Sequence, residues 1–72
     1  MPKLPVLKPR EAIRALERAG FTFERQKGSH RIYVKDGLGV TVPYHNKDIK
    51  WKTLKHIIKQ SNLEIEEFLT LL

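Results

Sequence analysis

Apolar residues at a spacing of three to four positions mark the first expected helix of this chain. Pro9 suits the first turn of such a helix, because the N–H that proline lacks has no helical partner there. Gly20 is typical of the residue that ends a helix. The pattern therefore predicts a helix between these two residues, preceded by an extended arm over residues 1–8 that carries two prolines. The apolar positions are Ala12, Ile13, Leu16 and Ala19.

Alternating apolar and polar residues in the middle of the chain predict three short strands. Asp36-Gly37, between the second and third strands, is a strong signal for a tight hairpin turn. Pro43 ends the third strand, because it cannot donate a hydrogen bond to a neighbouring strand. Connections this short favour an antiparallel sheet with one buried face. The three segments are 21–25, 30–35 and 39–42.

Two more helices are expected, at 52–61 and 65–71. The first has an apolar side and a basic side at the same helical spacing. The second has three glutamates near its N-terminal end, where the helix dipole favours negative charge. The apolar side contains Trp51, Leu54, Ile57 and Ile58, and the basic side contains Lys52, Lys55, His56 and Lys59.

Together these elements predict an α+β fold, an α-β-β-β-α sandwich with a three-stranded antiparallel sheet, helices on one face and a short C-terminal helix. This layer order is that of double-stranded-RNA-binding domains, which read duplex shape, phosphates and 2′-hydroxyls. The expected core is Ile13, Leu16, Phe21, Phe23, Ile32, Val34, Val40, Val42, Leu54, Ile57, Ile58 and Phe68.

The length and charge of the chain limit the classes of function that it can have. Its 72 residues suffice for one domain, 1–72, and leave no room for a deep pocket around a bulky cofactor. The formal net charge is +6, and all 14 Lys and Arg residues precede residue 61. A basic body with a short acidic tail favours nucleic acid or an acidic protein as the partner, although extra lysine also serves solubility.

Other features exclude whole classes of function. The chain has no cysteine, which rules out disulfides and thiolate zinc sites. No apolar run approaches the ~20 residues that span a bilayer, and the start of the chain lacks the apolar stretch of a signal peptide. We therefore expect no membrane association and a cytoplasmic location. The three histidines are widely spaced and there is no carboxylate cluster, so a metal site is weakly supported.

The segment Arg25–Arg31 carries the strongest indication of chemistry. Imidazole is the side chain best suited to moving protons near neutral pH, so His30 is the candidate acid or base. The neighbouring cations Arg25, Lys27 and Arg31 suit a phosphodiester substrate. In the same segment, Gly28 allows close approach of the backbone and Ser29 offers a hydroxyl donor.

Strand alternation complicates the placement of His30. It shares parity with Ile32 and Val34, which we expect to face the core, whereas Arg31, Tyr33 and Lys35 are expected to face solvent. We expect the Gly-Ser turn to break the pleat and leave His30 at the sheet margin beside the helices. From spacing alone, a partly buried histidine bonded to a backbone carbonyl is the favoured alternative.

Other candidates are weaker. From spacing alone, Lys52, Lys55 and Lys59 fit contacts to RNA phosphates about as well as they fit a solvated helix face, and the near absence of acids between residues 47 and 59 favours the RNA contacts. His45 is a candidate second acid/base group, and a loop residue without a role is slightly favoured. His56 is expected to be only a surface or phosphate contact. Tyr33 and Tyr44 fit base stacking and ordinary aromatic packing about equally.

Six segments of the chain match the motifs of one known family. The most specific block is Gly28-Ser29-His30 after Arg25-Gln26, and the block Thr41–His45 supports it. On these residues the sequence resembles the HicA toxins of HicA–HicB toxin–antitoxin systems over nearly its whole length. Lys8-Pro9 departs from the Ser-Gly of many members, and Lys52 stands where a glycine commonly opens the second helix. The matching segments are 2–7, 15–21, 25–30, 41–45, 53–54 and 57–60.

The resemblance implies a double-stranded-RNA-binding-like fold and an mRNA interferase that acts without the ribosome in a stress response. It also implies that His30 is catalytic and that a HicB-like antitoxin covers the site. The resulting hypothesis is a metal-independent endoribonuclease, a nuclease of the hydrolase type without a cofactor. The residues expected to bind the mRNA are Arg25, Lys27, Gly28, Ser29, Arg31, Lys52, Lys55 and Lys59.

Two other functions stay open at this point. A non-catalytic double-stranded-RNA-binding module binds duplex RNA in a salt-sensitive way and is indifferent to loss of His30. A protein–protein adaptor binds an acidic partner through its basic face and has no affinity for RNA. Nothing in the sequence indicates recognition of a particular base sequence.

Overall fold

The computed structural model describes residues 3–72 and has the predicted α+β architecture, with the order α-β-β-β-α followed by a C-terminal helix. Of the predicted arm, residues 1–2 lie outside the described residues, and residues 3–8 form neither helix nor strand. The elements are α1 (Pro9–Arg18), β1 (Thr22–Lys27), β2 (His30–Lys35), β3 (Leu38–Pro43), α2 (Trp51–Gln60) and α3 (Ile65–Thr70).

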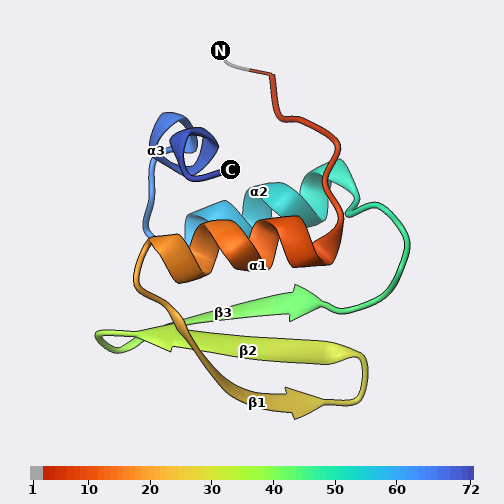
Figure 1. Ribbon diagram of the computed structural model, residues 1–72, viewed down its shortest axis with the longest axis vertical. Helices are drawn as coiled ribbons and strands as arrows, with labels where there is room; N and C mark the ends of the chain where they lie inside the picture. The colour runs from red at the N-terminus through yellow and green to blue at the C-terminus, as the bar shows by residue number, and fades with distance from the viewer. Residues whose placement is uncertain (1–2) are drawn as a thin grey trace.

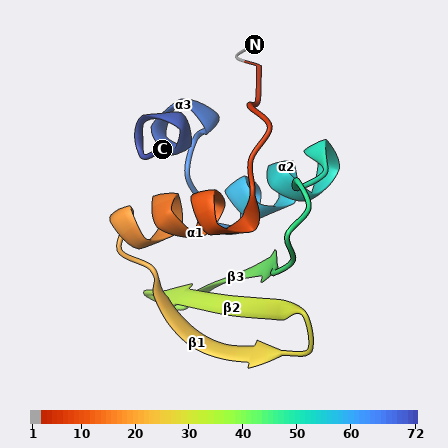
Figure 2. The same ribbon diagram turned by 45° about the vertical axis from the view of Figure 1, so that its right-hand side comes forward.

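The sheet is antiparallel with the strand order β1-β2-β3, and both connections are tight turns. At the β2–β3 turn, Asp36 and Gly37 both have positive φ, of 48° and 81°. That is the conformation of the turn expected for Asp-Gly. α1 and α2 lie side by side on one face of the sheet, and α3 lies beyond them (Figures 1 and 2). The other face of the sheet is not covered by any described helix.

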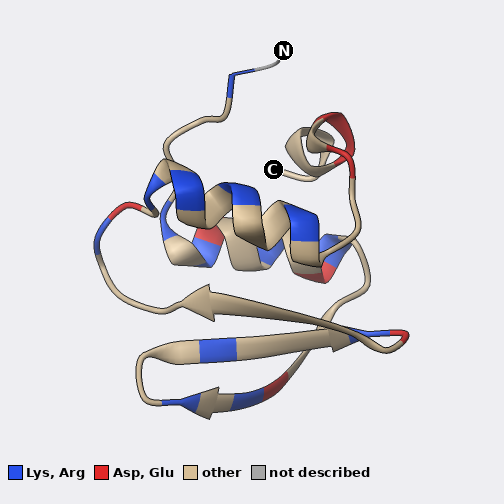
Figure 3. Cartoon of the chain, turned by 180° about the vertical axis from the view of Figure 1, so that it is seen from behind, with Lys and Arg blue, Asp and Glu red and all other residues tan. Residues whose placement is uncertain are grey.

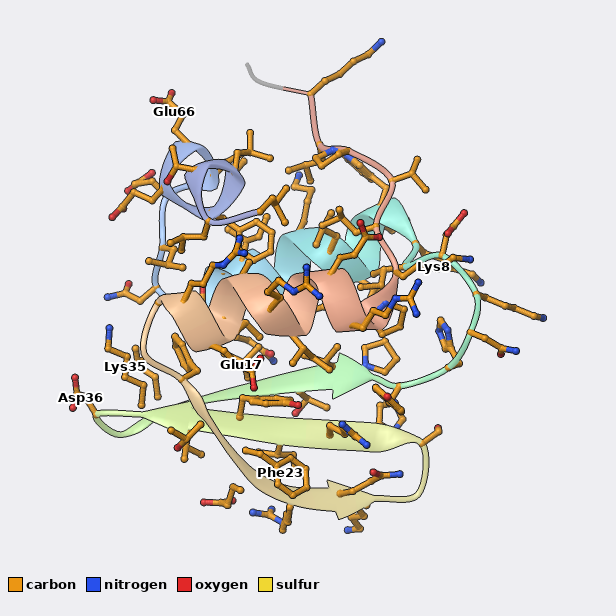
Figure 4. The ribbon with its side chains drawn as sticks, viewed as in Figure 1. Lys8, Glu17, Phe23, Lys35, Asp36 and Glu66 are labelled. Carbon is orange, nitrogen blue, oxygen red and sulfur yellow. The ribbon has the colours of Figure 1, made fainter. Side chains whose placement is uncertain are left out.

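A local contact explains where α1 begins, and two long-range hydrogen bonds hold its C-terminal end. Pro9 occupies the first turn, and the backbone N–H of Lys8 donates to Glu11 Oε1 at 2.8 Å. This bond supplies part of the cap that the Lys8 side chain cannot provide. At the other end, Arg18 Nη1 donates to the carbonyl of Leu71 at 2.8 Å, which ties α1 to the end of α3. Lys35 Nζ donates to the carbonyl of Ala19 at 2.6 Å, close to the start of the β2–β3 turn (Figure 4).

The core lies between the helices and the sheet. Nine of the predicted core residues are buried, whereas Phe23, Ile32 and Val34 are not. Leu7 and Ile49 are buried additions, joined by a hydrogen bond of 2.7 Å from the Ile49 N–H to the Leu7 carbonyl. The nine confirmed residues are Ile13, Leu16, Phe21, Val40, Val42, Leu54, Ile57, Ile58 and Phe68.

The predicted faces of β2 were wrong. Tyr33 is only 2% exposed and faces the helices, so Ile32 and Val34 lie half-buried on the opposite face. The reason is that β2 carries apolar side chains at both parities, so alternation alone does not choose the core face. The pairing with β3 decides, because Tyr33 lies opposite the fully buried Val40.

Two aromatic residues at predicted apolar positions, Phe23 and Trp51, are exposed at the margins of the core. Phe23 lies opposite Tyr33 and packs edge-on against its ring with centroids 5.8 Å apart, but β1 is an outer strand of the sheet and Phe23 remains 51% exposed. The label in Figure 4 marks Phe23 on this outer strand. Trp51 is 59% exposed at the start of α2, outside the buried stripe of that helix.

Candidate functional site

The β1–β2 turn consists of Gly28 and Ser29, flanked by the paired residues Lys27 and His30. Gly28 has a φ of +60°, a conformation that side chains rarely adopt. An added Cβ at this position meets nothing within 4 Å. The turn therefore needs glycine for its backbone conformation and not for lack of space.

His30 is the first residue of β2 and is exposed. Because side chains alternate along a strand and Tyr33 faces the helices, His30 lies on the opposite, uncovered face of the sheet with Ile32 and Val34. The expected position beside the helices was thus wrong, since the pleat continues through the start of β2. Exposure also argues against the alternative of a partly buried structural histidine.

Two of the predicted cations share this uncovered face. Lys27 lies directly opposite His30, and Arg25 lies opposite Ile32, two residues along the same face. Arg25 forms an ion pair with its neighbour Glu24. We call the surface formed by Arg25, Lys27 and His30 the histidine face. It brings an imidazole and two cations together at one end of the sheet, where an extended phosphodiester chain can reach them.

Arg31 points the other way, to the helix side of the sheet. Its guanidinium carbon lies 3.7 Å from the centroid of the Tyr44 ring and 5.6 Å from that of Phe23. Its Nε donates to Gln26 Oε1 at 3.0 Å. The predicted group of three cations is therefore divided between the two faces. Tyr33 is packed in the core, and the Tyr44 ring is in contact with Arg31.

The predicted lysines of α2, Lys52, Lys55 and Lys59, are all exposed. They follow α2 as a row in the view from behind (Figure 3). All three line an open groove of about 530 Å³ between α2 and the start of α3. Lys55 Nζ lies 4.5 Å from the centroid of the exposed Trp51 ring. This basic row lies on the helix side of the molecule and does not join the histidine face.

His45 is exposed in the segment between β3 and α2. Its Nδ1 accepts a hydrogen bond from the Lys47 N–H at 3.2 Å. It lines a second cavity of about 390 Å³ near the start of α1, and His30 is not among the residues that line it. A role for His45 in proton transfer stays a prediction.

Two residues that hold the β1–β2 turn were not predicted from the sequence: Gln26 acts through its side chain and Tyr44 through its backbone N–H. Gln26 Nε2 donates to the Gly28 carbonyl at 3.0 Å, and the Tyr44 N–H donates to the Ser29 carbonyl at 2.6 Å. Gln26 lies within the conspicuous Arg25–Arg31 segment, but its contacts depend on the register of β1 and β2. Tyr44 is distant in sequence, and no local pattern indicates its contact with the turn.

Within residues 3–72, no group of three or more His, Cys, Asp or Glu side chains is placed to hold a metal ion. In the same part of the chain, no helix is both long and apolar enough to cross a membrane.

Fold and site together define a small basic α-β-β-β-α protein that presents one exposed histidine and neighbouring cations on an uncovered sheet face. The family model described as the HicA toxin of bacterial toxin–antitoxin systems matches residues 9–63 of the 72-residue chain. The chain belongs to the HicA toxin family. No curated protein matches it at a significant level. The matched region extends from the start of α1 past the end of α2 and includes the histidine face.

Proposed function

We propose that this protein is a metal-independent endoribonuclease that cleaves mRNA through His30 and is neutralised by a HicB-like antitoxin. Membership of the HicA toxin family supports the toxin role. The observation that carries the proposal is the exposure of His30 on the uncovered sheet face, opposite Lys27. A large substrate can reach an imidazole in this position without any opening of the fold.

The proposed reaction needs two proton transfers. The 2′-hydroxyl of the RNA attacks the adjacent phosphorus, the bond from phosphorus to the 5′-oxygen breaks, and a cyclic phosphate and a free 5′-hydroxyl result. His30 serves either as the base that takes the 2′-hydroxyl proton or as the acid that protonates the leaving oxygen. Lys27 and Arg25 share its face and stabilise the negative charge that develops on the phosphate.

The proposed protein partner is an antitoxin that presents carboxylates to the same cations. An acidic surface on the histidine face covers His30, Lys27 and Arg25 together, so RNA and antitoxin compete for it. Because mRNA is the proposed substrate, the activity belongs in the cytoplasm. A complex that forms without loss of ribonuclease activity would contradict this arrangement.

The alternative function is a non-catalytic double-stranded-RNA-binding module. The separate row of Lys52, Lys55 and Lys59 on α2 supports it, because these exposed lysines line one groove on the helix side of the molecule, away from the histidine face. Such a module binds duplex RNA with a strong salt dependence and does not need His30.

The deciding experiment is cleavage of a long single-stranded RNA in EDTA by the wild type and by His30→Ala. Loss of a positioned acid or base is expected to lower the cleavage rate by about 10²–10⁴-fold. Arg14→Ala, which changes an exposed residue of α1, is the control and should cleave as the wild type does. Direct labelling of the fragments by a 5′-kinase tests for the free 5′-hydroxyl.

Each result has a clear meaning. Cleavage by the wild type and Arg14→Ala but not by His30→Ala supports the proposal. Equal cleavage by His30→Ala refutes the role of His30, and cleavage by the wild type only when EDTA is left out refutes metal independence. If the wild type binds duplex RNA but cleaves nothing, the binding module is correct.

A further inference from the structure

The turn that presents His30 is held by hydrogen bonds and not by packing. Every residue of β1 is exposed, and so are Gly28, Ser29 and His30. An added Cβ at Gly28 meets nothing within 4 Å, so no neighbouring group presses on the turn there. Because glycine populates many backbone conformations, this turn has little rigidity of its own. Its conformation depends on the groups bonded to its two carbonyls.

Both carbonyls of the turn accept hydrogen bonds. The Gln26 amide donates to the carbonyl of Gly28 at 3.0 Å, and the Tyr44 N–H donates to the carbonyl of Ser29 at 2.6 Å. The Ser29 carbonyl belongs to the peptide unit that joins Ser29 to His30, so this second bond sets the orientation in which His30 leaves the turn. Each bond anchors the turn to a neighbouring strand or its continuation.

Arg31 joins the two anchoring residues. Its Nε donates to Gln26 Oε1 at 3.0 Å, which leaves the amide nitrogen of Gln26 directed at Gly28. Its guanidinium carbon lies 3.7 Å from the centroid of the Tyr44 ring. A planar guanidinium can stack on a ring and donate from its edge at the same time, which an ammonium group cannot do. One side chain thus fixes both partners of the turn.

We propose that Arg31 is a positioning residue, which acts through Gln26 and Tyr44 to fix the Gly28-Ser29 turn and thereby His30, instead of contacting RNA. The expected effect of Arg31 on the cleavage rate rests on the proposed ribonuclease function. Because side chains alternate along a strand, Arg31 points away from the histidine face, to the side where it contacts Gln26 and Tyr44. As a partner of Arg31, Gln26 is also part of the site without any contact to substrate. A small displacement of a catalytic group costs as much as 10²-fold in rate, so such support matters.

The test compares Arg31→Lys and Gln26→Met. Arg31→Lys keeps the positive charge but loses the planar stack and the Nε donor. Gln26→Met keeps the length of the side chain and the net charge but cannot donate to Gly28. We expect each to lower kcat about tenfold while KM stays within about twofold of the wild type. The double variant should be about as slow as either single one, since both break one network. Arg14→Lys is the matched control and should keep wild-type kinetics.

Amide hydrogen exchange gives a readout that does not depend on activity. The Tyr44 N–H should exchange about tenfold faster in Arg31→Lys and Gln26→Met, because the turn that its bond holds has loosened. The Tyr33 N–H, in the middle of β2, should exchange at the wild-type rate. A general loss of stability accelerates both amides and overturns the inference.

The remaining outcomes separate this inference from the proposed function. If Arg31→Lys keeps the wild-type kcat, the inference is wrong, and a change in KM alone assigns Arg31 to substrate binding instead. If the wild type cleaves no RNA, the proposed function fails, and the exchange of Tyr44 alone decides whether Arg31 orders the turn. Unchanged exchange of Tyr44 in both variants overturns the inference whatever the activity.

Discussion

Replacing Gly28 by alanine measures how much the positive φ at this position contributes to the free energy of unfolding. Gly28 has a φ of +60°, and an added Cβ has open space around it. Steric overlap with neighbouring side chains is therefore absent, and the whole cost comes from placing an L-residue in the left-handed region. That cost is roughly 1–2 kcal/mol. For a domain of this size it lowers Tm by roughly 5–15 °C.

The chain offers a matched control in the same sheet. Gly39 in β3 also has nothing within 4 Å of an added Cβ, but its φ lies outside the left-handed region. Gly39→Ala should leave the stability unchanged or raise it by about 0.5–1 kcal/mol, because alanine restricts the unfolded chain. Gly37, with a φ of +81° and open space, should behave as Gly28 does.

The assay is thermal and urea unfolding of the three alanine variants under one set of conditions. The expected order places Gly28→Ala and Gly37→Ala below the wild type and Gly39→Ala at or above it. If Gly28→Ala unfolds within about 0.5 kcal/mol of Gly39→Ala, the turn does not require the positive φ, and the strain argument is refuted. Unchanged urea m-values show that the variants differ in stability and not in the extent of unfolding.

Three further predictions test other parts of the structure. Tyr33→Ala should cost about 3–4 kcal/mol in urea unfolding and Val34→Ala about 1 kcal/mol, and equal costs would contradict the assigned faces of β2. Arg18→Met removes the bond to the Leu71 carbonyl and should cost about 0.5–1 kcal/mol while speeding amide exchange in α3, and unchanged exchange there would show that the bond does not hold α3. Lys27→Gln should lower the salt dependence of binding to single-stranded RNA by about 0.7 in the slope of log K against log salt, and an unchanged slope would place RNA off the histidine face.

Much of the fold was predictable from local patterns. The bounds of β2 were predicted correctly, because the two turns beside it contain glycines that mark its ends. Pro9 and Gly20 likewise marked the limits of α1 within one or two residues. Such features depend on a few neighbouring residues, which is why sequence alone reveals them.

The orientation of β2 and the contacts of the site were not predictable in this way. Both parities of β2 contain apolar residues, so the face was decided by pairing with the buried Val40 and Val42 of β3. The register of β1 also shifts between Phe23 and Arg25, a bulge that no alternation rule anticipates. The partners of Arg31 follow from this register and from Tyr44, which lies beyond the end of β3.

The position of the candidate site follows from how thin the protein is. With its shortest principal extent only 17 Å, the part of the chain that the structure describes has one layer of sheet and a single core on its helix side. A catalytic group cannot be buried in a deep cleft of such a molecule, so it has to act from a surface. A histidine at the surface keeps a defined position relative to a substrate only if its backbone is held in place. In this protein the backbone of His30 is held by the Gly28-Ser29 turn and by the hydrogen bonds that Gln26 and Tyr44 donate to that turn. In the proposed function a long RNA reaches His30 from the open face, and Arg31 holds Gln26 and Tyr44 from the helix side of the sheet.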